Sequence, residues 1–539
     1  MIRTLQSILA IALIFITGVF ASRGQENATS ADPKSGDKKQ EKKDKATGTF
    51  KIGKETTYVT GPLDAAGRID YAAAINDRLG KGVTPATNAV VLLWNAMGAH
   101  PDGVTMPAEF FHRLGIAPPP ETGKYFVEIR PYIQDQLKRE PPADILERHG
   151  RATSWPWSGD DEPLLASWLE ANEKPLGLVV EATKRKHYYN PLIPEKSESV
   201  ASGLLEARLP GPQKARALAA ALSIRAMRYT HQGKLDEAWN DLLAGYRLGR
   251  LIGRGGTLIE GLVGVAINQI IASALPAYIE RVGNDVKRLE ACARDLRDLP
   301  PLPDVAEQVS FFDRFMLLDV IMNIDRRGLK CLRGDKEPEA GDIFAEFVLD
   351  GINWDPALQT INLWIDRLAA GLREKTRAAR VREYDRFVKD LKALKERASD
   401  REATSKAVLE SKETGKVWGQ VIGNVLVSLM LPAAGKVQDA VDRSQQIQEN
   451  LQVAFALARY RADHREYPTD LRELTPKYLA RVPDDLFSTK PLIYRLDGKG
   501  YLLYSVGLNG QDDGGRSTGD DPKGDDLVIR MPPKEPRRP

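Results

Sequence analysis

The chain has few of the residues on which metal and redox chemistry depend. Its 539 residues include 2 cysteines and 6 histidines, and Cys292 and Cys331 lack the paired spacing of zinc ligands. Neither an H-E-x-x-H sequence nor a Walker loop occurs, so zinc-protease and nucleotide-binding chemistry have no local signature. An enzyme is not thereby excluded, because triads and carboxylate pairs assemble from distant positions.

Neither sign of charge dominates the composition. The 77 basic and 74 acidic residues leave a net charge of +3, so no general field attracts the protein to nucleic acid or to membranes. We therefore expect no nucleic-acid partner. Residues 22–48 consist mainly of Lys, Asp, Glu, Ser and Gly, which bury little apolar surface and predict a disordered charged linker.

The N-terminus has the pattern of an export signal. Met1 to Gln6 carries one positive charge, and an apolar run from Ile8 to Phe20 follows. The run is about 13 residues long, short of the ~20 residues that span a membrane. Small residues predict cleavage after Ala21, with an uncleaved anchor as the alternative. We expect an exported protein of the periplasm or cell envelope, with no stable membrane span after signal cleavage.

In an exported protein, Cys292 and Cys331 could form one disulfide bond or remain two buried thiols. The sequence does not decide between these alternatives.

Apolar residues recur at helical spacing along most of the remaining chain. The predicted fold class is mainly α, a multi-helix body with a small C-terminal α+β module. The predicted regions are a signal peptide (1–21), the linker (22–48), a mixed, mainly helical domain (49–212), a helical domain (213–423), the module (424–531) and a disordered tail (532–539).

The region 49–212 predicts several short helices. Apolar spacing predicts one over 69–79, and Thr84 as N-cap with Pro85 after it predicts the start of the next. An amphipathic helix is expected over 162–172, and 176–182 fits either a strand or a helix. Aromatic and basic residues gather in one segment, which suggests core packing or a cleft for carbohydrate or an anion. They are Trp155, Trp157, Trp168, Lys184, Arg185, His187, Tyr188 and Tyr189.

The region 213–423 predicts a helical hairpin and a long charged helix. The hairpin covers 214–281 with Gly233 as its first break, and it resembles a single tetratricopeptide unit. An ordinary hairpin is the alternative. The charged helix is expected over 364–397 with one packed seam. The seam residues are Val381, Tyr384, Val388 and Leu391.

The C-terminal region has a distinctive order of elements. A long helix over 423–465, with a proline in it, precedes Glu466-Tyr467-Pro468, a short capped helix and two or three short strands, with a hairpin turn at Asp497-Gly498. With Leu-Met-Leu-Pro at 429–432, this order resembles a type II secretion major pseudopilin. The resemblance implies a long helix plus a three-stranded antiparallel sheet over 424–531.

The whole arrangement also resembles large exported bacterial proteins of unknown function that carry this module behind a helical body. Pseudopilins begin with a cleaved leader and an apolar helix. In this chain the corresponding position, about 20 residues before Pro432, is the charged stretch 411–416. Residues 255–275 are similar to the leader motif but lie deep inside the chain, and their small residues predict a buried helix. We therefore expect a pseudopilin-like tail rather than a filament subunit.

Six aspartates precede the last predicted strand. The pseudopilin resemblance implies a calcium site there, and carboxylate oxygens separated by glycines suit Ca²⁺. A solvated surface loop is the alternative. The candidate ligands are Asp512, Asp513, Asp520, Asp521, Asp525 and Asp526.

Taken together, these features favour an exported, non-catalytic envelope protein whose helical body binds an unidentified envelope protein and whose module is stabilised by calcium. One alternative is an exported hydrolase that acts on envelope polymers through a cleft in 49–212. Another is an accessory of a type II secretion system. The sequence assigns no catalytic residue. A pocket lined by two or more acidic side chains would favour the hydrolase. A shallow apolar surface on the helices would favour the binding protein.

Overall fold

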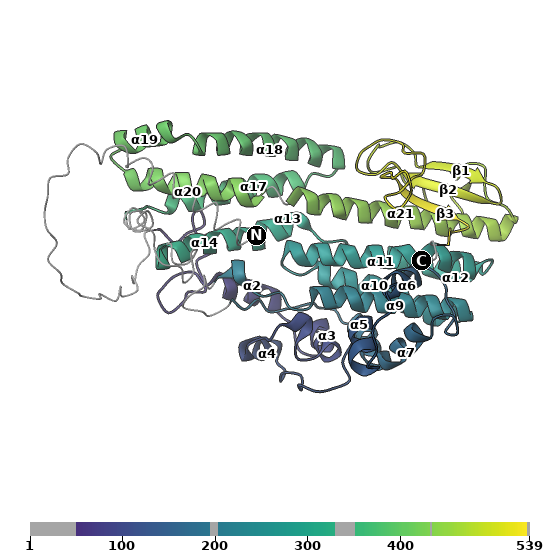
Figure 1. Ribbon diagram of the computed structural model, residues 1–539. Coiled ribbons are helices and arrows are strands. Elements are labelled where there is room, and N and C mark those ends of the chain that lie inside the picture. Colours follow the sequence, from purple (N-terminus) through teal and green to yellow (C-terminus); the bar gives the residue numbers. More distant parts are fainter. Residues whose placement is uncertain (1–49, 195–202, 329–350, 432–433, 536–539) are drawn as a thin grey trace. The chain divides into compact units, whose positions relative to one another are not determined.

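The fold is described from a computed structural model of the chain (Figure 1), which describes residues 50–194, 203–328, 351–431 and 434–535. The predicted signal peptide, the charged linker, Cys331, Pro432 and the last four residues of the predicted tail lie outside these ranges. The expectations for them stay predictions.

The chain forms two compact units, each assembled from three separated segments. Unit 1 comprises Met1–Lys81, Leu192–Leu209 and Ala306–Gly435, and unit 2 comprises Gly82–Pro191, Pro210–Val305 and Lys436–Pro539. Each of the three folded regions predicted from the sequence contributes to both units. The consecutive division differs from the observed one because packing joins segments that a reading along the chain keeps apart.

The elements of unit 1 in its described residues are all helices. Its elements are α2 Tyr71–Gly80, η3 Leu204–Glu206, α13 Val305–Gln308, η4 Val309–Asp313, α14 Arg314–Arg327, α17 Asp355–Leu372, α18 Arg377–Ala398, α19 Arg401–Glu410 and α20 Thr414–Met430.

The centre of unit 1 holds a buried arginine. The side chain of Arg314 is 0% exposed, and its guanidinium lies 4.0 Å from the centroid of the Tyr58 ring. Its Nη1 donates to Asn362 Oδ1 at 2.9 Å, and its Nη2 donates to Asp366 Oδ1 at 2.5 Å. Asn362 in turn donates to the carbonyl oxygen of Thr56 at 2.7 Å. This network ties the first described segment to α14 and α17.

The long charged helix predicted over 364–397 is wrong, because two helices, α17 and α18, cover it. Thr376 caps α18 by accepting a hydrogen bond from the N–H of Ala379, and this cap starts a new helix. The packed seam of α18 also differs from the prediction. Its buried residues are Phe387, Leu391 and Leu394, whereas Val381 and Val388 are exposed. Two stripes of apolar residues on this helix fit a three-four spacing, so the spacing alone does not identify the buried one.

Unit 2 contains a helical layer and the described strands of the chain. Its helices are α3 Ala89–Met97, η1 Pro101–Gly103, α4 Ala108–Leu114, α5 Ile129–Pro131, η2 Tyr132–Gln136, α6 Ile145–Ser154, α7 Pro163–Ala171, α8 Glu173–Ala182, α9 Pro212–Gln232, α10 Leu235–Gly253, α11 Leu258–Val282, α12 Val286–Arg297, α21 Ala434–His464 and η6 Leu471–Leu474. Its strands are β1 Ile493–Asp497, β2 Gly500–Ser505 and β3 Leu527–Met531.

The start of α3 corrects a predicted cap. Asn88, rather than Thr84, is the N-cap, and its Oδ1 accepts from the N–H of Val90 at 3.2 Å. The same oxygen accepts from the N–H of Tyr189 at 3.0 Å. A partner 101 residues away in sequence therefore fixes this helix start. The segment 176–182, which fitted either type of element, belongs to helix α8.

Helices α9, α10 and α11 lie side by side (Figure 1) and form the layer at the centre of unit 2. Gly233 ends α9 with φ +75°, a left-handed conformation that favours glycine, so the predicted break is present. The predicted range 214–281 nevertheless contains three helices, of which α9 and α10 form the hairpin at Gly233. Its tetratricopeptide identity stays a prediction. Helix α10 approaches α11 closely at Gly249, where a Cβ would lie 2.8 Å from the carbonyl oxygen of Gly264.

Among the described residues, α11 is the one helix with the length and apolar character needed to cross a membrane. In its most apolar window, 61% of the residues are buried inside the protein. The buried face includes Val263, Ile267 and Ile271, as in the core helix predicted for this segment.

The C-terminal region contains the predicted sheet in antiparallel order β1-β2-β3. The single helix predicted over 423–465 is wrong, since α20 ends at Met430 and α21 begins at Ala434. The β1–β2 turn is one residue later than predicted, because Asp497 still pairs with Gly500. A mainly helical fold with a small three-stranded antiparallel sheet near the C-terminus is therefore confirmed. The pseudopilin identity of that part stays a prediction.

Candidate functional site

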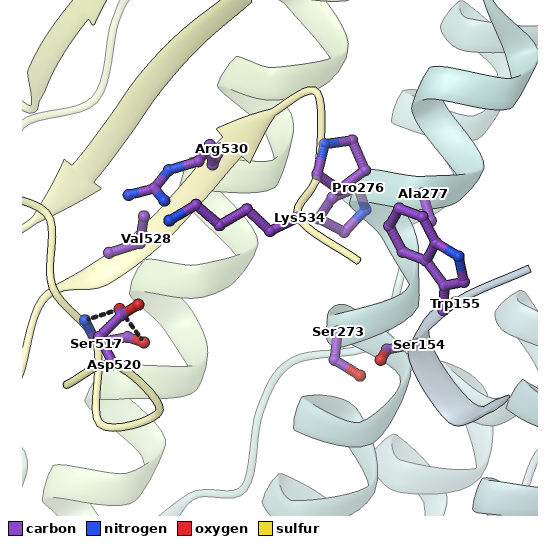
Figure 2. Close-up of a pocket in the computed structure, with 11 residues that line it drawn as sticks. Ser154, Trp155, Ser273, Pro276, Ala277, Ser517, Asp520, Val528, Arg530 and Lys534 are labelled. Atoms are coloured by element: carbon purple, nitrogen blue, oxygen red, sulfur yellow. Dashed lines mark hydrogen bonds between the residues drawn. The ribbon is translucent and has the colours of Figure 1, made fainter. Parts of the chain in front are cut away.

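A pocket of about 220 Å³ in unit 2 brings together five separate stretches of sequence (Figure 2). Figure 2 shows the side chains of Arg530 and Lys534 on the same side of the pocket as Ser517 and Asp520. Trp155, Ser154 and Ser273 lie on the side of α6 and α11. The lining residues are Ser154, Trp155, Ser273, Pro276, Ala277, Ser517, Asp520, Val528, Arg530, Pro533 and Lys534.

Two prolines, Pro156 and Pro276, shape the backbone on the helical side of the pocket. Trp155 ends α6 in an extended conformation, as expected for a residue that precedes a proline, here Pro156. Pro276 lies inside α11 and has no N–H to donate to the preceding turn. The hydroxyl of Ser273 donates to the carbonyl oxygen of Ile270 at 2.7 Å, so its lone pairs remain available to a ligand.

On the sheet side of the pocket, the alternation of side chains along β3 determines which residues line it. Along β3, Leu527, Ile529 and Met531 are buried, whereas Val528 and Arg530 are partly exposed. Successive side chains of a strand point to opposite faces, so Arg530 projects away from the core that its neighbours fill. Its Nε is buried and has no hydrogen-bond partner among the described residues.

The loop side of the pocket presents an ionised carboxylate. Asp520 Oδ2 accepts from the backbone N of Ser517 at 2.7 Å and from its Oγ at 2.9 Å (Figure 2). These hydrogen bonds hold the pKa of Asp520 below its usual range, and the nearby charges of Arg530 and Lys534 lower that pKa further. Asp520 is therefore negatively charged at neutral pH.

A second depression, of about 310 Å³, lies on α17 and α18 of unit 1. Its charged groups pair largely with one another. Arg367 lies 2.6 Å from Asp390 and Arg386 lies 2.7 Å from Glu383. Because these pairs are neutralised internally, this depression is less suited to a charged ligand than the pocket of unit 2.

The six candidate calcium ligands share the loop between β2 and β3, and several of their carboxylates accept hydrogen bonds from the loop itself. Asp526 is 2% exposed, and its oxygens accept from the N–H of Gly515 at 2.7 Å and of Asp513 at 3.3 Å. Asp513 accepts from the N–H of Asp525 at 2.7 Å. Carboxylate–amide hydrogen bonds therefore close the base of the loop.

The other aspartates of the loop point in different directions. Asp512 accepts from the hydroxyl of Tyr504 at 2.9 Å, and Asp525 accepts from Arg443 Nη1 at 2.6 Å. Asp520 lines the pocket, and Asp521 is exposed.

The chemistry of this loop suits calcium, but its geometry does not gather the donors. Burial raises the pKa of Asp526, and the charges of Asp513 and Asp512 raise it further, a repulsion that a cation would relieve. Among the described residues, however, no three His, Cys, Asp or Glu side chains are grouped closely enough to hold one ion. Calcium binding by this loop stays a prediction.

In the aromatic and basic segment near 155–189, Trp157, Trp168 and Tyr189 are buried in the core, whereas Lys184 is exposed. Trp157 Nε1 donates to the carbonyl oxygen of Ile224 at 2.9 Å, and Trp168 Nε1 donates to that of Val127 at 2.7 Å. Only Trp155 of this set lines the pocket of unit 2.

Three further members of that set have hydrogen-bond partners within the protein. Arg185 donates to the carbonyl oxygen of Asn88 at 2.8 Å, Lys184 to Glu181 at 2.6 Å, and Tyr188 to Glu260 at 3.3 Å.

Arg530, Lys534, Ser273 and Ser517 were missed by reasoning from the sequence. The alternation of apolar residues along 527–531 could have placed Arg530 opposite the core. Ser517 is the centre of a Gly-x-Ser-x-Gly sequence over 515–519, and this motif was missed as well. That motif marks a nucleophile when it joins a strand to a helix, and here residues 516–526 form turns and irregular structure.

Cys292 is a buried free thiol. Burial raises its pKa to about 12, so the thiolate needed for nucleophilic chemistry does not form near neutral pH.

Comparisons of the chain with protein-family models, with curated proteins and with solved structures find no match.

Proposed function

We propose that this chain is an exported, non-catalytic protein of the cell envelope that binds envelope polymers in a pocket formed jointly by the helical body and a pseudopilin-like C-terminal module, in place of the envelope protein expected from the sequence. The observation that supports it most is the origin of the pocket's lining. Ser154 and Ser273 come from helices of the body, whereas Asp520 and Arg530 come from the last part of the chain. Such shared pockets between parts of a protein are common ligand sites.

The polar groups of the pocket favour binding over chemical transformation. Among its eleven lining residues, all of them described, Asp520 is the one carboxylate. Glycoside hydrolysis generally uses two. Ser517 is hydrogen-bonded to Asp520 rather than to a histidine, and a carboxylate whose pKa is lowered is a weak general base. Hydroxyls, an indole and cations recognise a ligand without needing to react with it.

Calcium remains in the proposal as a structural ligand of the loop 512–526. Its support is the supply of hard carboxylate oxygens between glycines. Its role would be to hold the loop against the sheet.

The proposal is tested with the full-length chain in two steps. Cell fractionation of a C-terminally tagged chain should place it outside the cytoplasm. The purified protein should then retain solubilised envelope polymers without changing them, as measured by co-sedimentation and by chromatography of the polymers before and after incubation. Shortened polymers or new chain ends would support the hydrolase instead. Recovery in the cytoplasm alone would refute the export on which the proposal depends.

A further inference from the structure

The pocket of unit 2 carries an excess of positive charge. Arg530 and Lys534 face a single carboxylate, Asp520, and one oxygen of that carboxylate is already occupied by Ser517. Charges that a protein does not neutralise internally attract a ligand of opposite sign, most strongly where solvent is partly excluded. The pocket therefore favours a ligand that brings a negative group.

Arg530 is placed to bind that group. β3 fixes its backbone through pairing with Leu502, and its buried Nε has no hydrogen-bond partner among the described residues. A buried donor without a partner is costly, and an arginine satisfies it best with two parallel hydrogen bonds to a carboxylate or a sulfate. Lys534, which is exposed, can adjust its position around the same anion.

The rest of the lining suits the body of a sugar. Trp155 offers a flat apolar surface, and Pro276 and Pro533 add two more. Ser154, Ser273 and Ser517 supply hydroxyl oxygens, which accept or donate to hydroxyl groups. The volume of about 220 Å³ lies below the ~300 to 1,000 Å³ of pockets for drug-sized ligands, so one ring fits rather than a long oligomer.

We infer that the pocket binds one acidic sugar residue, a uronic acid or a sulfated sugar, with its anionic group at Arg530 and Lys534 and its ring against Trp155. This inference rests on the proposed binding function and names its ligand class. A free inorganic anion would use the two cations but not the indole. A neutral sugar would use the indole and hydroxyls but leave the Nε of Arg530 without a hydrogen-bond partner.

The test uses isothermal titration calorimetry on the full-length chain with four probes: a methyl glucuronide, a sulfated methyl glucoside, methyl glucoside and sodium sulfate. One or both acidic sugars should bind at least about tenfold more tightly than methyl glucoside or sulfate, because the charge-assisted pair is available only to them. Their binding should weaken as salt concentration rises. Which acidic sugar binds more tightly distinguishes a carboxylate from a sulfate ester.

Three variants separate the contributions. Arg530→Gln should weaken the acidic sugar about tenfold and leave methyl glucoside unchanged. Trp155→Ala should weaken both sugars. Lys499→Gln removes an exposed positive charge from the β1–β2 turn, outside the pocket, and should change neither. Matching circular dichroism spectra and Tm values would show that the variants remain folded.

The outcomes also separate this inference from the proposed function. Equal binding of methyl glucoside and the acidic sugars, or binding of none, would overturn the acidic-sugar inference. If envelope polymers were still retained in a way that depends on Trp155 and Arg530, the proposed binding function would stand. If wild type and both pocket variants retained the polymers equally, the pocket would have no part in binding. That result would refute the acidic-sugar inference and the proposed binding function together.

Discussion

Arg443 on α21 and Asp525 at the base of the aspartate-rich loop are joined by a hydrogen-bonded ion pair, with Nη1 2.6 Å from Oδ1. Both side chains are about one-fifth exposed, and 82 residues separate them in sequence. Asp525 Oδ2 also accepts from the N–H of Asn509 at 3.1 Å. The loop that supplies Ser517 and Asp520 to the pocket is thereby attached to the long helix.

Replacing this arginine tests that attachment. Arg443→Gln should lower the free energy of unfolding by about 1 to 2 kcal/mol, because a partly buried carboxylate loses its charged partner. Asp525→Asn should cost about as much, and the double variant should cost less than the sum of the two. Urea denaturation measures all three. Strictly additive costs would show that the two side chains do not act as a pair.

Calcium is tested by a cycle of chelation and mutation. If calcium holds the loop, EDTA should lower the Tm of the full-length chain, and Asp525→Ala plus Asp526→Ala should lower it and abolish the response to EDTA. The mutations alone prove little, because both carboxylates accept hydrogen bonds within the protein. Differential scanning calorimetry with excess calcium or EDTA decides. An identical wild-type Tm in both conditions would remove calcium from the proposal.

The buried arginine of unit 1 should contribute strongly to stability. Arg314→Ala should cost about 3 kcal/mol, since it leaves a cavity and removes the donor to buried Asn362. Arg367→Ala is the matched control, because its ion pair with Asp390 is about half exposed and worth less than ~1 kcal/mol. Equilibrium denaturation compares the two. Similar costs for both would contradict the central position given to Arg314.

Asp313 in η4 makes stability depend on pH. Burial raises its pKa to about 7, whereas an unfolded aspartate has a pKa of about 3.9. The folded state binds more protons between these values, so the free energy of unfolding should fall as pH rises from about 4 through 7.

Asp313→Asn, which has no charge to bury, should raise the free energy of unfolding by about 2 kcal/mol at pH 8 and change it little at pH 4. Urea titrations at the two pH values measure this difference, with exposed Asp385→Asn as the control. Equal effects at both pH values would show that Asp313 is not the group that titrates.

The approach of α10 to α11 should tolerate no added methyl group. Gly249→Ala would place a Cβ about 2.5 Å from Asn268 Oδ1 and should cost about 1 to 3 kcal/mol. Gly177 in α8 has nothing within 4 Å of its added Cβ, so Gly177→Ala should stabilise the protein by about 0.5 to 1 kcal/mol through helix propensity. Thermal melting of both variants would show the opposite signs. Stabilisation by both would mean that the helices can move apart.

The elements that sequence predicted well are those set by neighbouring residues. Gly233 marked the end of α9 because a glycine in a left-handed conformation closes a helix locally. Elements fixed by distant partners were misplaced: Asn88 caps α3 while it is bonded to Tyr189.

The candidate site shows the same division. The aspartates could be found as a cluster by composition, whereas the pocket beside them depends on Arg530 and Trp155, more than 370 residues apart in numbering. No local pattern links such positions.

By itself, the sequence determined that the chain is mainly helical with a small sheet near its C-terminus, because helical spacing and strand alternation are properties of consecutive residues. Only the tertiary structure decided which of the apolar stripes on α18 is buried, that each unit is built from three separated segments, and that Trp155, Ser273, Asp520 and Arg530 share one pocket. These features depend on packing between segments that are distant in sequence. Several arrangements satisfy the local sequence preferences equally well, and the burial of apolar surface and the pairing of buried polar groups select one of them.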